Sequence, residues 1–412
     1  MRGLLTSPPY IEMERVELQK SPLFHKRLSL FMAVGTLIGV CAAAVESDVF
    51  SIVAMALCAA GFVLFSSRYL HLSLMCLLAL LMIGLQYALG GRSFDFENSS
   101  LYGWTLGLRE GMEAKIDLLF DDYNGLIKGL LLGDKYGISQ ELYSVYVNNG
   151  VAHLFAVSGL HISILSGFVL RLFRPVAQWL RATVLVAFLA IYVCLTGLSP
   201  SAMRAAVMLL VILSAKLVKG RPDYLSAFSI AMTVVLFVSP SAIQRSSFLL
   251  SFGCVYGILM LSDPLKKFLR MPKGMVSSLL ITGVVVNFAV LPWSAKFFGG
   301  ISLTAIPISI LVLPLSSILI ISSFVAVVVS YIFQPLAAVI AYLPKGLLFC
   351  INHLLNWANV GLFSLKAPND ISTALWFVSI FFLSKYYLPN RTKFPIIGVL
   401  LLAASILLWI LI

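Results

Sequence analysis

Two histidines and a serine lie close together in the run VAHLFAVSGLHISILSGFV, residues 151–169, whose other side chains are mostly apolar. They are His153, Ser158 and His161. If the run is helical, Ser158 and His161 share one face, because side chains three positions apart on a helix are neighbours. A hydroxyl beside an imidazole suggests either a nucleophile with its general base or polar groups that line a path for a substrate.

The small residues of this run extend its polar side. Gly159 and Ser166 belong to it, while Gly159 and Gly167 also fit the close packing of two membrane helices. Ionisable groups inside a membrane usually face a cavity or a partner. A functional role is therefore predicted for His161.

A serine hydrolase is one alternative for this run. With Ser158 as nucleophile and a histidine as base, the protein would be similar to an intramembrane serine protease. That class has glycine where Ala156 stands and takes its histidine from a later span, whereas the only later histidine here is His353, in an amphipathic segment. The sequence favours polar lining over hydrolysis.

A short motif occurs twice, as SPSAMR from residue 199 and as SPSAIQR from residue 239. Serine followed by proline is typical of an N-cap and first helical position, so Pro200 and Pro240 are each predicted to begin a helix at the outer side of a membrane. Arg204 and Arg245 then fall about one turn inside. Amide groups at a helix start attract anions, and an arginine beside them strengthens binding of phosphate or carboxylate. Snorkelling of both arginines to lipid headgroups is the alternative.

The elements that carry these residues are predicted from composition. Of 412 residues, 60% are hydrophobic and only 11% are charged, too few to cover a water-soluble globule of this size. The apolar runs are continuous and do not alternate, which in a bilayer indicates helices and excludes barrel strands. We predict an all-α, polytopic helical membrane protein with about 10–13 membrane helices, including amphipathic segments.

The expected spans are close to the roughly 20 residues that cross hydrocarbon. A continuous uncharged region at 301–333 is expected either to cross once or to form a re-entrant pair of half-helices, and an amphipathic piece follows near 335–364. The other spans are expected near 29–45, 49–66, 70–89, 153–170, 182–198, 202–218, 225–239, 246–262, 275–292, 372–388 and 394–411.

Lysine and arginine are concentrated in alternate connections between these spans. By the excess of positive charge in cytoplasmic loops, those connections face the cytoplasm, and the net charge of +12 is mostly a topology signal. The protein is thus predicted in the cytoplasmic (inner) membrane, with its N-terminus in the cytoplasm and its C-terminus outside. Residues 301–364 must then cross an even number of times. The basic residues are Arg68, Arg171, Arg174, Arg181, Lys216, Lys219, Arg221, Lys266, Lys267, Arg270, Lys273, Lys385, Arg391 and Lys393.

Four parts follow from this topology. Residues 1–28 are expected as a cytoplasmic N-terminal segment, 29–89 as N-terminal transmembrane helices, 90–152 as an extracytoplasmic segment, and 153–412 as the main transmembrane domain. The extracytoplasmic segment is expected to contain an amphipathic helix that lies along the membrane surface. Its apolar face consists of Ile116, Leu119, Phe120, Ile127, Leu130 and Leu131.

Three stretches in this order resemble the ComEC competence-protein family. They are GLLLGDKYGISQELYSVYVNNGVAHLFAVSGLHISIL from residue 129, SPSAMRAAVML from residue 199 and RSSFLLSFGCVYGILML from residue 245. The resemblance extends over about residues 101–390 and includes Gly133 and Asp134 as a structural motif, with Pro200 and Pro240. It implies a competence-type channel over 153–412 that carries single-stranded DNA across the cytoplasmic membrane during natural transformation.

The longest members of that family have two domains that we do not expect here. One is an outer OB-like domain, for which residues 90–110 leave no room, and the other is a metallo-β-lactamase-like domain, whose metal pair needs an H-x-H-x-D-H run that the sequence lacks. No metal, cofactor or enzymatic activity is therefore expected. No ATP-binding loop is present either. The expected partners are single-stranded DNA, membrane lipids, other competence proteins, a separate nuclease and a cytoplasmic ATP-driven motor.

A polyanion needs a water-filled route with polar walls, because it cannot cross hydrocarbon. The aromatic residues Phe155, Phe248, Phe252 and Tyr256 are candidates to stack on bases, with core packing as the alternative. A small-solute transporter is a further alternative, but the two SPSA copies have the same orientation, which argues against inverted repeats. The residues predicted to line a DNA channel are His153, Ser158, Gly159, His161, Arg204, Arg245, Ser251 and Asn287.

Overall fold

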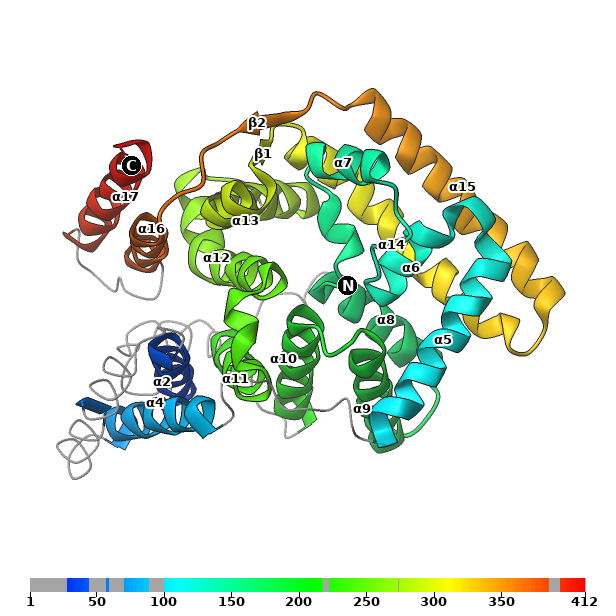
Figure 1. The fold of residues 1–412 in the computed structure, drawn as a ribbon, viewed down its shortest axis with the longest axis horizontal. Coiled ribbons are helices and arrows are strands. Elements are labelled where there is room, and N and C mark those ends of the chain that lie inside the picture. Colours follow the sequence, from blue (N-terminus) through cyan, green and yellow to red (C-terminus); the bar gives the residue numbers. More distant parts are fainter. Residues whose placement is uncertain are drawn as a thin grey trace, which may run out of the picture.

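The computed structural model is built almost wholly of α-helices, which confirms the all-α prediction (Figure 1). It describes residues 28–43, 57–58, 70–88, 100–217, 222–272, 274–384 and 393–411. Within these ranges, six helices are long and apolar enough to cross a membrane, and several shorter apolar helices accompany them. The predicted span at 49–66 lies outside the described residues, apart from two helical positions.

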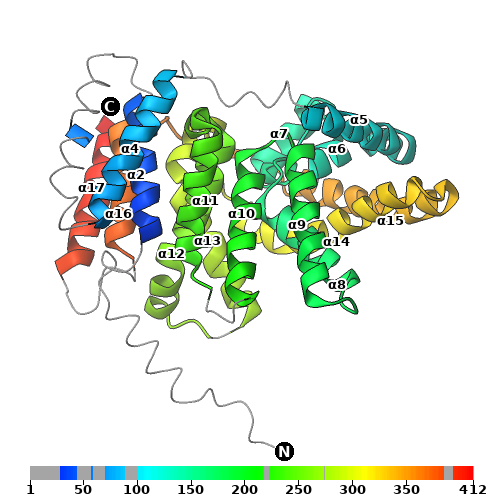
Figure 2. The same ribbon diagram turned by 90° about the horizontal axis from the view of Figure 1, so that it is seen from below.

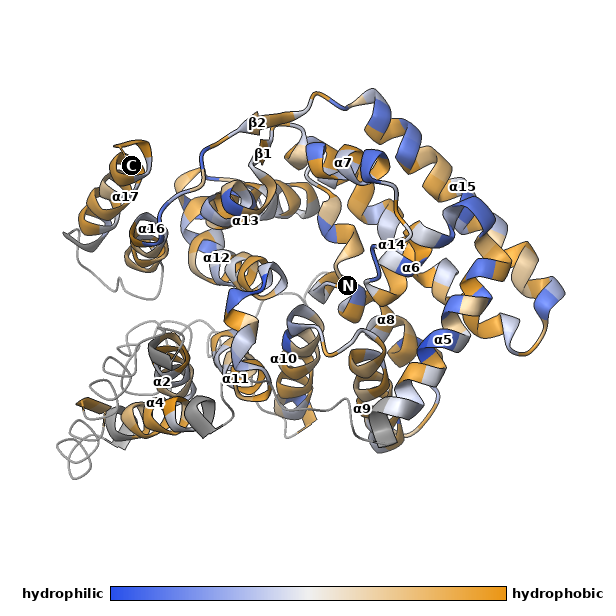
Figure 3. Ribbon diagram, viewed as in Figure 1, coloured by the Kyte–Doolittle hydropathy of each residue, from blue (hydrophilic) through white to orange (hydrophobic). Residues whose placement is uncertain are grey.

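The central helices run side by side, whereas α5 and α15 extend at a large angle to them (Figure 2). Figure 3 shows hydrophobic residues along most of the central helices and hydrophilic stretches on α5, α7 and α15. The central helices are α8 (Gly159–Leu172), α9 (Gln178–Leu195), α10 (Pro200–Leu217), α11 (Tyr224–Val238), α12 (Ser246–Phe268) and α13 (Met275–Phe298).

Five helices form a closed ring of contacts. Helix α8 packs against α10, α10 against α12, α12 against α13, and α13 against α14 (Ala305–Ser330), which returns to α8. Helices α9 and α11 both pack against α10, one on each side of it (Figure 1). The ring joins segments that are far apart in the sequence. It includes α10, which begins in the first SPSA copy, and α12, which begins just after the second copy.

Helices α14 and α15 (Gln334–Trp357) pack as a hairpin. Most of the region 301–333 is thus one continuous helix, α14, with Pro314 inside it, so of the two alternatives the structure has the single helix and not the pair of half-helices. Strand β1 (Gly300–Ser302) pairs antiparallel with β2 (Leu362–Ser364), so both ends of the hairpin lie together. This agrees with an even number of crossings. Helix α15 is amphipathic, with a buried stripe of Ala337, Ala341, Pro344, Leu348, Ile351 and Leu355.

The segment between the first helices and the ring folds against the ring as three helices, α5 (Ser100–Phe120), α6 (Asn124–Leu132) and α7 (Gln140–Asn148). The expected single amphipathic helix is wrong, because the chain turns at Asp121, whose φ is 39°. All six residues of its expected apolar face are buried inside the protein, so that face does not lie on a membrane surface.

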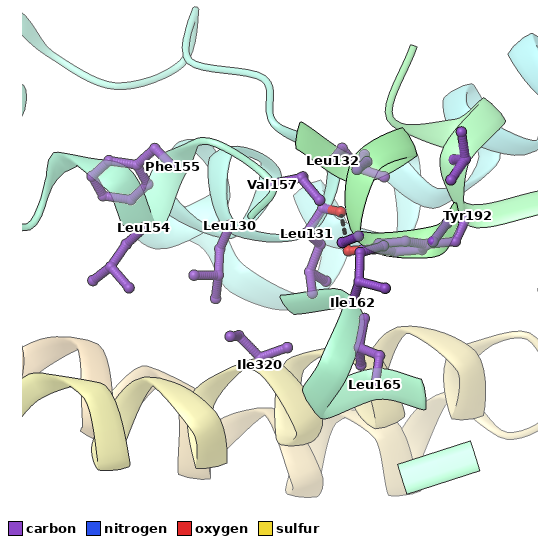
Figure 4. Close-up of a cluster of buried hydrophobic side chains, with 14 of the residues drawn as sticks. Leu130, Leu131, Leu132, Leu154, Phe155, Val157, Ile162, Leu165, Tyr192 and Ile320 are labelled. Atoms are coloured by element: carbon purple, nitrogen blue, oxygen red, sulfur yellow. Dashed lines mark hydrogen bonds between the residues drawn. The ribbon is translucent and has the colours of Figure 1, made fainter. Parts of the chain in front are cut away.

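A buried cluster holds these helices on the ring (Figure 4). Leu130 and Leu131 of α6 pack with Ile162 of α8 and Ile320 of α14, and the Tyr192 hydroxyl of α9 donates to the Leu131 carbonyl over 2.8 Å. Four helices are thereby fixed around the start of α8.

Helix α7 is also held to the end of α15. Burial raises the pKa of Tyr146, so its phenol stays protonated and donates to Asn352 Oδ1 over 2.6 Å. Asn149 at the end of α7 donates to the Leu355 carbonyl over 2.9 Å. These bonds connect the segment before the ring to the hairpin that closes it.

Two helical pairs lie at the side of the ring (Figure 1). Helix α2 (Leu28–Ala43) packs with α4 (Leu70–Ala88) and against α11, while α16 (Asp370–Phe382) packs with α17 (Lys393–Leu411). In the second pair, Ser372 and Ser405 each donate to the other's carbonyl, over 2.9 and 2.8 Å. Such reciprocal bonds satisfy polar groups that would otherwise be unpaired between two apolar helices.

Candidate functional site

The start of α8 determines where the predicted residues lie. Residues Ala152–Phe155 form a short 3-10 helix, the chain then extends, and α8 begins only at Gly159. The expected helix at 153–170 is therefore wrong in its first turn. His153 is exposed and bonds to the Gly150 carbonyl over 3.2 Å, so it does not share a helix with His161.

Ser158 is the N-cap of α8, because its ψ of 170° is extended and its Oγ accepts from the Leu160 N–H over 3.2 Å. His161 Nδ1 lies 3.3 Å from the Ser158 N–H and 2.9 Å from Ser158 Oγ. Because the backbone N–H donates, Nδ1 is the acceptor, which places the imidazole proton on Nε2. This reciprocal pairing is a capping box with histidine in the place of the usual Glu or Gln.

The same 2.9 Å contact is within reach for a nucleophile and its base. The Oγ is already engaged as a helix cap, however, and among the described residues no carboxylate orients His161. The imidazole is fully buried, and its Nε2 has no hydrogen-bond partner in the described part of the chain. The arrangement therefore fits a fixed helix start better than a hydrolase dyad.

The first SPSA copy confirms its predicted local structure. Ser199 Oγ accepts from the Ala202 N–H over 3.3 Å, and α10 begins at Pro200. Ser201 donates to the carbonyl of Val157 over 2.5 Å, which joins the start of α10 to the chain just before α8. This role of Ser201 was missed from the sequence, although its place directly after the cap and proline in both copies was a visible signal.

Arg204 lies one turn into α10 as predicted, and only 6% of it is exposed. Its guanidinium carbon lies 5.8 Å from the centroid of the Phe252 ring on α12. A Cβ added at Gly159 would lie 2.7 Å from Arg204 Nη2, so this glycine makes room for the guanidinium at the start of α8. Arg204 Nε is buried without a hydrogen-bond partner among the described residues. One side chain of α10 thus lies against two other helices of the ring, α8 and α12.

The second SPSA copy differs. Pro240 begins only a short 3-10 helix, Pro240–Gln244, and Arg245 follows in an extended conformation with ψ 134°. Helix α12 then begins at Ser246. The expectation that Arg245 lies one turn inside a membrane helix is wrong: it precedes α12 and is exposed. The extra residue in SPSAIQR places the arginine at the break between the two helices, where its side chain is not enclosed.

Ser251 and Asn287, the remaining predicted lining residues, form no hydrogen bond with Arg204 in the described part of the chain. Ser251 is half-buried on α12, and Asn287 on α13 donates to the Gly283 carbonyl of its own helix over 2.9 Å. Three of the four proposed stacking aromatics are buried in the core, and Tyr256 donates to the Phe377 carbonyl over 3.2 Å. The buried three are Phe155, Phe248 and Phe252.

Gly133 and Asp134 form a turn behind the start of α8. Gly133 ends α6 with φ +78°, a conformation that favours glycine, and Asp134 Oδ1 accepts from the Tyr136 N–H over 3.0 Å. A Cβ at Gly133 would contact the side chain of Val157, at 3.4 Å. The motif therefore packs against the residue that precedes Ser158.

The model of the competence-protein family matches residues 130–390, a range that contains this site and the whole ring. The chain belongs to the competence-protein family. The resemblance to ComEC proteins is thereby confirmed, and the membrane character of the chain agrees with it.

Three curated proteins are similar to parts of the chain. ComE operon protein 3 of Bacillus subtilis (strain 168) is 30% identical over 196 residues, which are 47% of this chain and 25% of that protein. Recombination protein 2 of Haemophilus influenzae is 30% identical over 146 residues, 33% of this chain and 18% of that protein. The uncharacterised protein YcaI of Escherichia coli (strain K12) is 27% identical over 197 residues, 44% of this chain and 26% of that protein. The chain thus covers about a quarter or less of each relative, and no solved structure matches it.

Proposed function

We propose that this protein is a channel that carries single-stranded DNA across the cytoplasmic membrane during natural transformation. The observation that carries the proposal is the closed ring of α8, α10, α12, α13 and α14, with Arg204 held between three of its helices. Membership of the competence-protein family supports DNA as the substrate. The ring lies within residues 153–412, which we propose as the channel domain.

A ring of helices suits this task for a physical reason. A polyanion crosses a membrane only along a polar path, and that path must attract phosphates without holding them so tightly that they are not released. A path with few positive charges and several hydroxyl and amide groups attracts phosphates weakly enough to release them. A strongly basic tunnel would bind the polyanion too tightly. Besides Arg204, we propose that Ser158, Gly159, His161, Ser251 and Asn287 border this path, with Arg245 and His153 near its outer end.

We propose no catalytic step for this chain. The Ser158–His161 contact is the one observation that favours a hydrolase, and its use as a helix cap explains the same geometry. A small-solute transporter with paired repeats fits less well, because the two SPSA copies adopt different backbone conformations.

The proposed orientation follows the distribution of basic residues, with the N-terminus in the cytoplasm and the C-terminus outside. Transport would then draw on a cytoplasmic ATP-driven motor, and a separate nuclease would degrade the strand that is not transported. Other competence proteins would deliver DNA to the outer end of the ring.

A deletion of this chain in its host tests the proposal. Cells are incubated with labelled DNA, and DNA bound outside is separated from DNA that has become resistant to added nuclease. We expect surface binding to persist and internal DNA to be lost, with recovery when the wild-type chain is restored. Normal internal DNA in the deletion strain would contradict a channel, and loss of surface binding would indicate a receptor.

A further inference from the structure

We propose that Arg204, together with the first turn of α8, forms a buried site for one phosphodiester anion. The inference deepens the proposed function and rests on it for the statement that DNA supplies the anion during transport. The site lies where α10, α8 and α12 meet, and Gly159 forms its wall on the α8 side.

The first reason is an uncompensated charge. A guanidinium stays protonated at any physiological pH, and a buried charge is strongly unfavourable unless it is paired. No carboxylate of the described residues pairs with Arg204. Its neighbours there are the Phe252 ring, the Cys254 thiol and the start of α8, and its Nε has no acceptor. The ion pairs among the described residues are Arg109–Glu113, Lys128–Asp117, Lys296–Asp370 and Lys345–Asp121.

The second reason is the position of the guanidinium. The N-terminus of a helix carries a partial positive charge, so a cation placed beside it is repelled. Arg204 Nη2 nevertheless lies at the first residue of α8, close enough that a Cβ on Gly159 would collide with it. Two positive groups this close together in a buried place are stabilised when an anion lies beside both of them.

The third reason is an open hydrogen-bond donor. The Phe252 ring lies near the guanidinium, with its centroid 5.8 Å from the guanidinium carbon, and Arg204 Nε has no acceptor among the described residues. Nε and an Nη together form the fork that binds two oxygens of a phosphate. A phosphodiester presents two such oxygens and one negative charge, which matches a single guanidinium.

Both DNA and phospholipid headgroups contain a phosphodiester, so the experiment has to separate these sources. The full chain is purified in a maltoside detergent, which contains no phosphate, and its midpoint of thermal unfolding, Tm, is measured. The probes are an oligothymidylate, the same oligomer with an uncharged methylphosphonate backbone, phosphatidylglycerol, and a diacylglycerol with the same chains. Binding to the folded state alone raises Tm with probe concentration.

We expect the Tm of the wild-type chain to rise with a phosphodiester probe and to stay constant with its uncharged partner. Arg204→Met should abolish the rise and, without any probe, should unfold at or above the wild-type Tm, because an apolar side chain replaces an unpaired buried charge. Arg204→Lys keeps the charge but loses the fork, so about tenfold more probe should be needed for the same rise. Arg171→Gln, at an exposed arginine in the last turn of α8, is the matched control and should respond as the wild type does.

An unchanged rise in Arg204→Met, or an equal loss in Arg171→Gln, would overturn the site. So would an Arg204→Met chain that unfolds well below the wild type or fails to fold, because the charge would then have its counterion within the chain. A rise with the oligomer identifies DNA as a source, and a rise with phosphatidylglycerol alone identifies lipid. Since these measurements need no transport, failure of the import experiment leaves the outcome for this site unchanged.

Discussion

Substitutions at Ser158 separate a helix cap from a nucleophile. Ser158→Ala removes the acceptor for the Leu160 N–H and one of the two partners of His161 Nδ1. Loss of an N-cap costs about 1 kcal/mol, and Nδ1 keeps the Ser158 backbone N–H. We therefore expect local opening of the first turn of α8 to become about five times more frequent, with the rest of the chain unaffected.

Ser158→Asn is the matched variant, because asparagine caps helices as well as serine does but has no nucleophilic hydroxyl. Hydrogen exchange of the amides of Leu160 and His161 is measured on the purified chain. It should be about five times faster in the alanine variant than in the wild type, and unchanged in the asparagine variant. DNA import should be nearly normal in Ser158→Asn and only mildly reduced in Ser158→Ala.

A hydrolase would give the opposite result. Loss of the hydroxyl would abolish a covalent step in both variants, whatever the stability of α8. If Ser158→Asn and Ser158→Ala both lose all activity while their exchange rates differ as expected, the interpretation that Ser158 acts only as a cap and lining residue is refuted.

Three further predictions follow from the same region and its supports. His161→Gln should fold as the wild type does, because glutamine at this position can also accept from the Ser158 N–H, whereas His161→Leu leaves that N–H unpaired and should lower stability by about 1–3 kcal/mol; denaturant unfolding in detergent measures both. Gly133→Ala should cost about 1–2 kcal/mol for its φ of +78° alone, and Gly150→Ala should cost more, since its added Cβ would also lie 2.5 Å from that of Ala305; equal costs would contradict the close approach of Gly150 to Ala305. A cysteine at Gly299 should react with an impermeant outside reagent and one at Lys267 should not, and the reverse pattern would invert the proposed orientation.

Local features of the sequence were sufficient for the helical membrane architecture and for part of the site. Continuous apolar runs predict spanning helices, because each helix satisfies its own backbone hydrogen bonds in lipid. The start of α10 is equally local: the Ser199 cap and Pro200 act within one turn, so the first residue of that helix and the depth of Arg204 in it were predicted correctly.

Other features depended on residues far away in the chain. Two arginines in nearly identical motifs received different environments: Arg204 is enclosed by Gly159 and Phe252, whereas Arg245 lies at a break between helices and is exposed. The extra residue of the second motif moves Arg245 out of a helix, but the burial of Arg204 depends on α8 and α12, which approach it from elsewhere in the chain.

The ring itself is the clearest case of a property that only the tertiary structure decided. Hydropathy predicts that α8 and α14 are apolar but not that they meet, since any two apolar helices in lipid have similar affinity for each other and for the acyl chains. Their contact is decided by packing, supported by the β1–β2 pair and by Tyr146 and Asn149 bound to the end of α15. The residues that close the ring thus carry no distinctive sequence signal. Their role depends on side-chain packing between helices that are far apart in the chain.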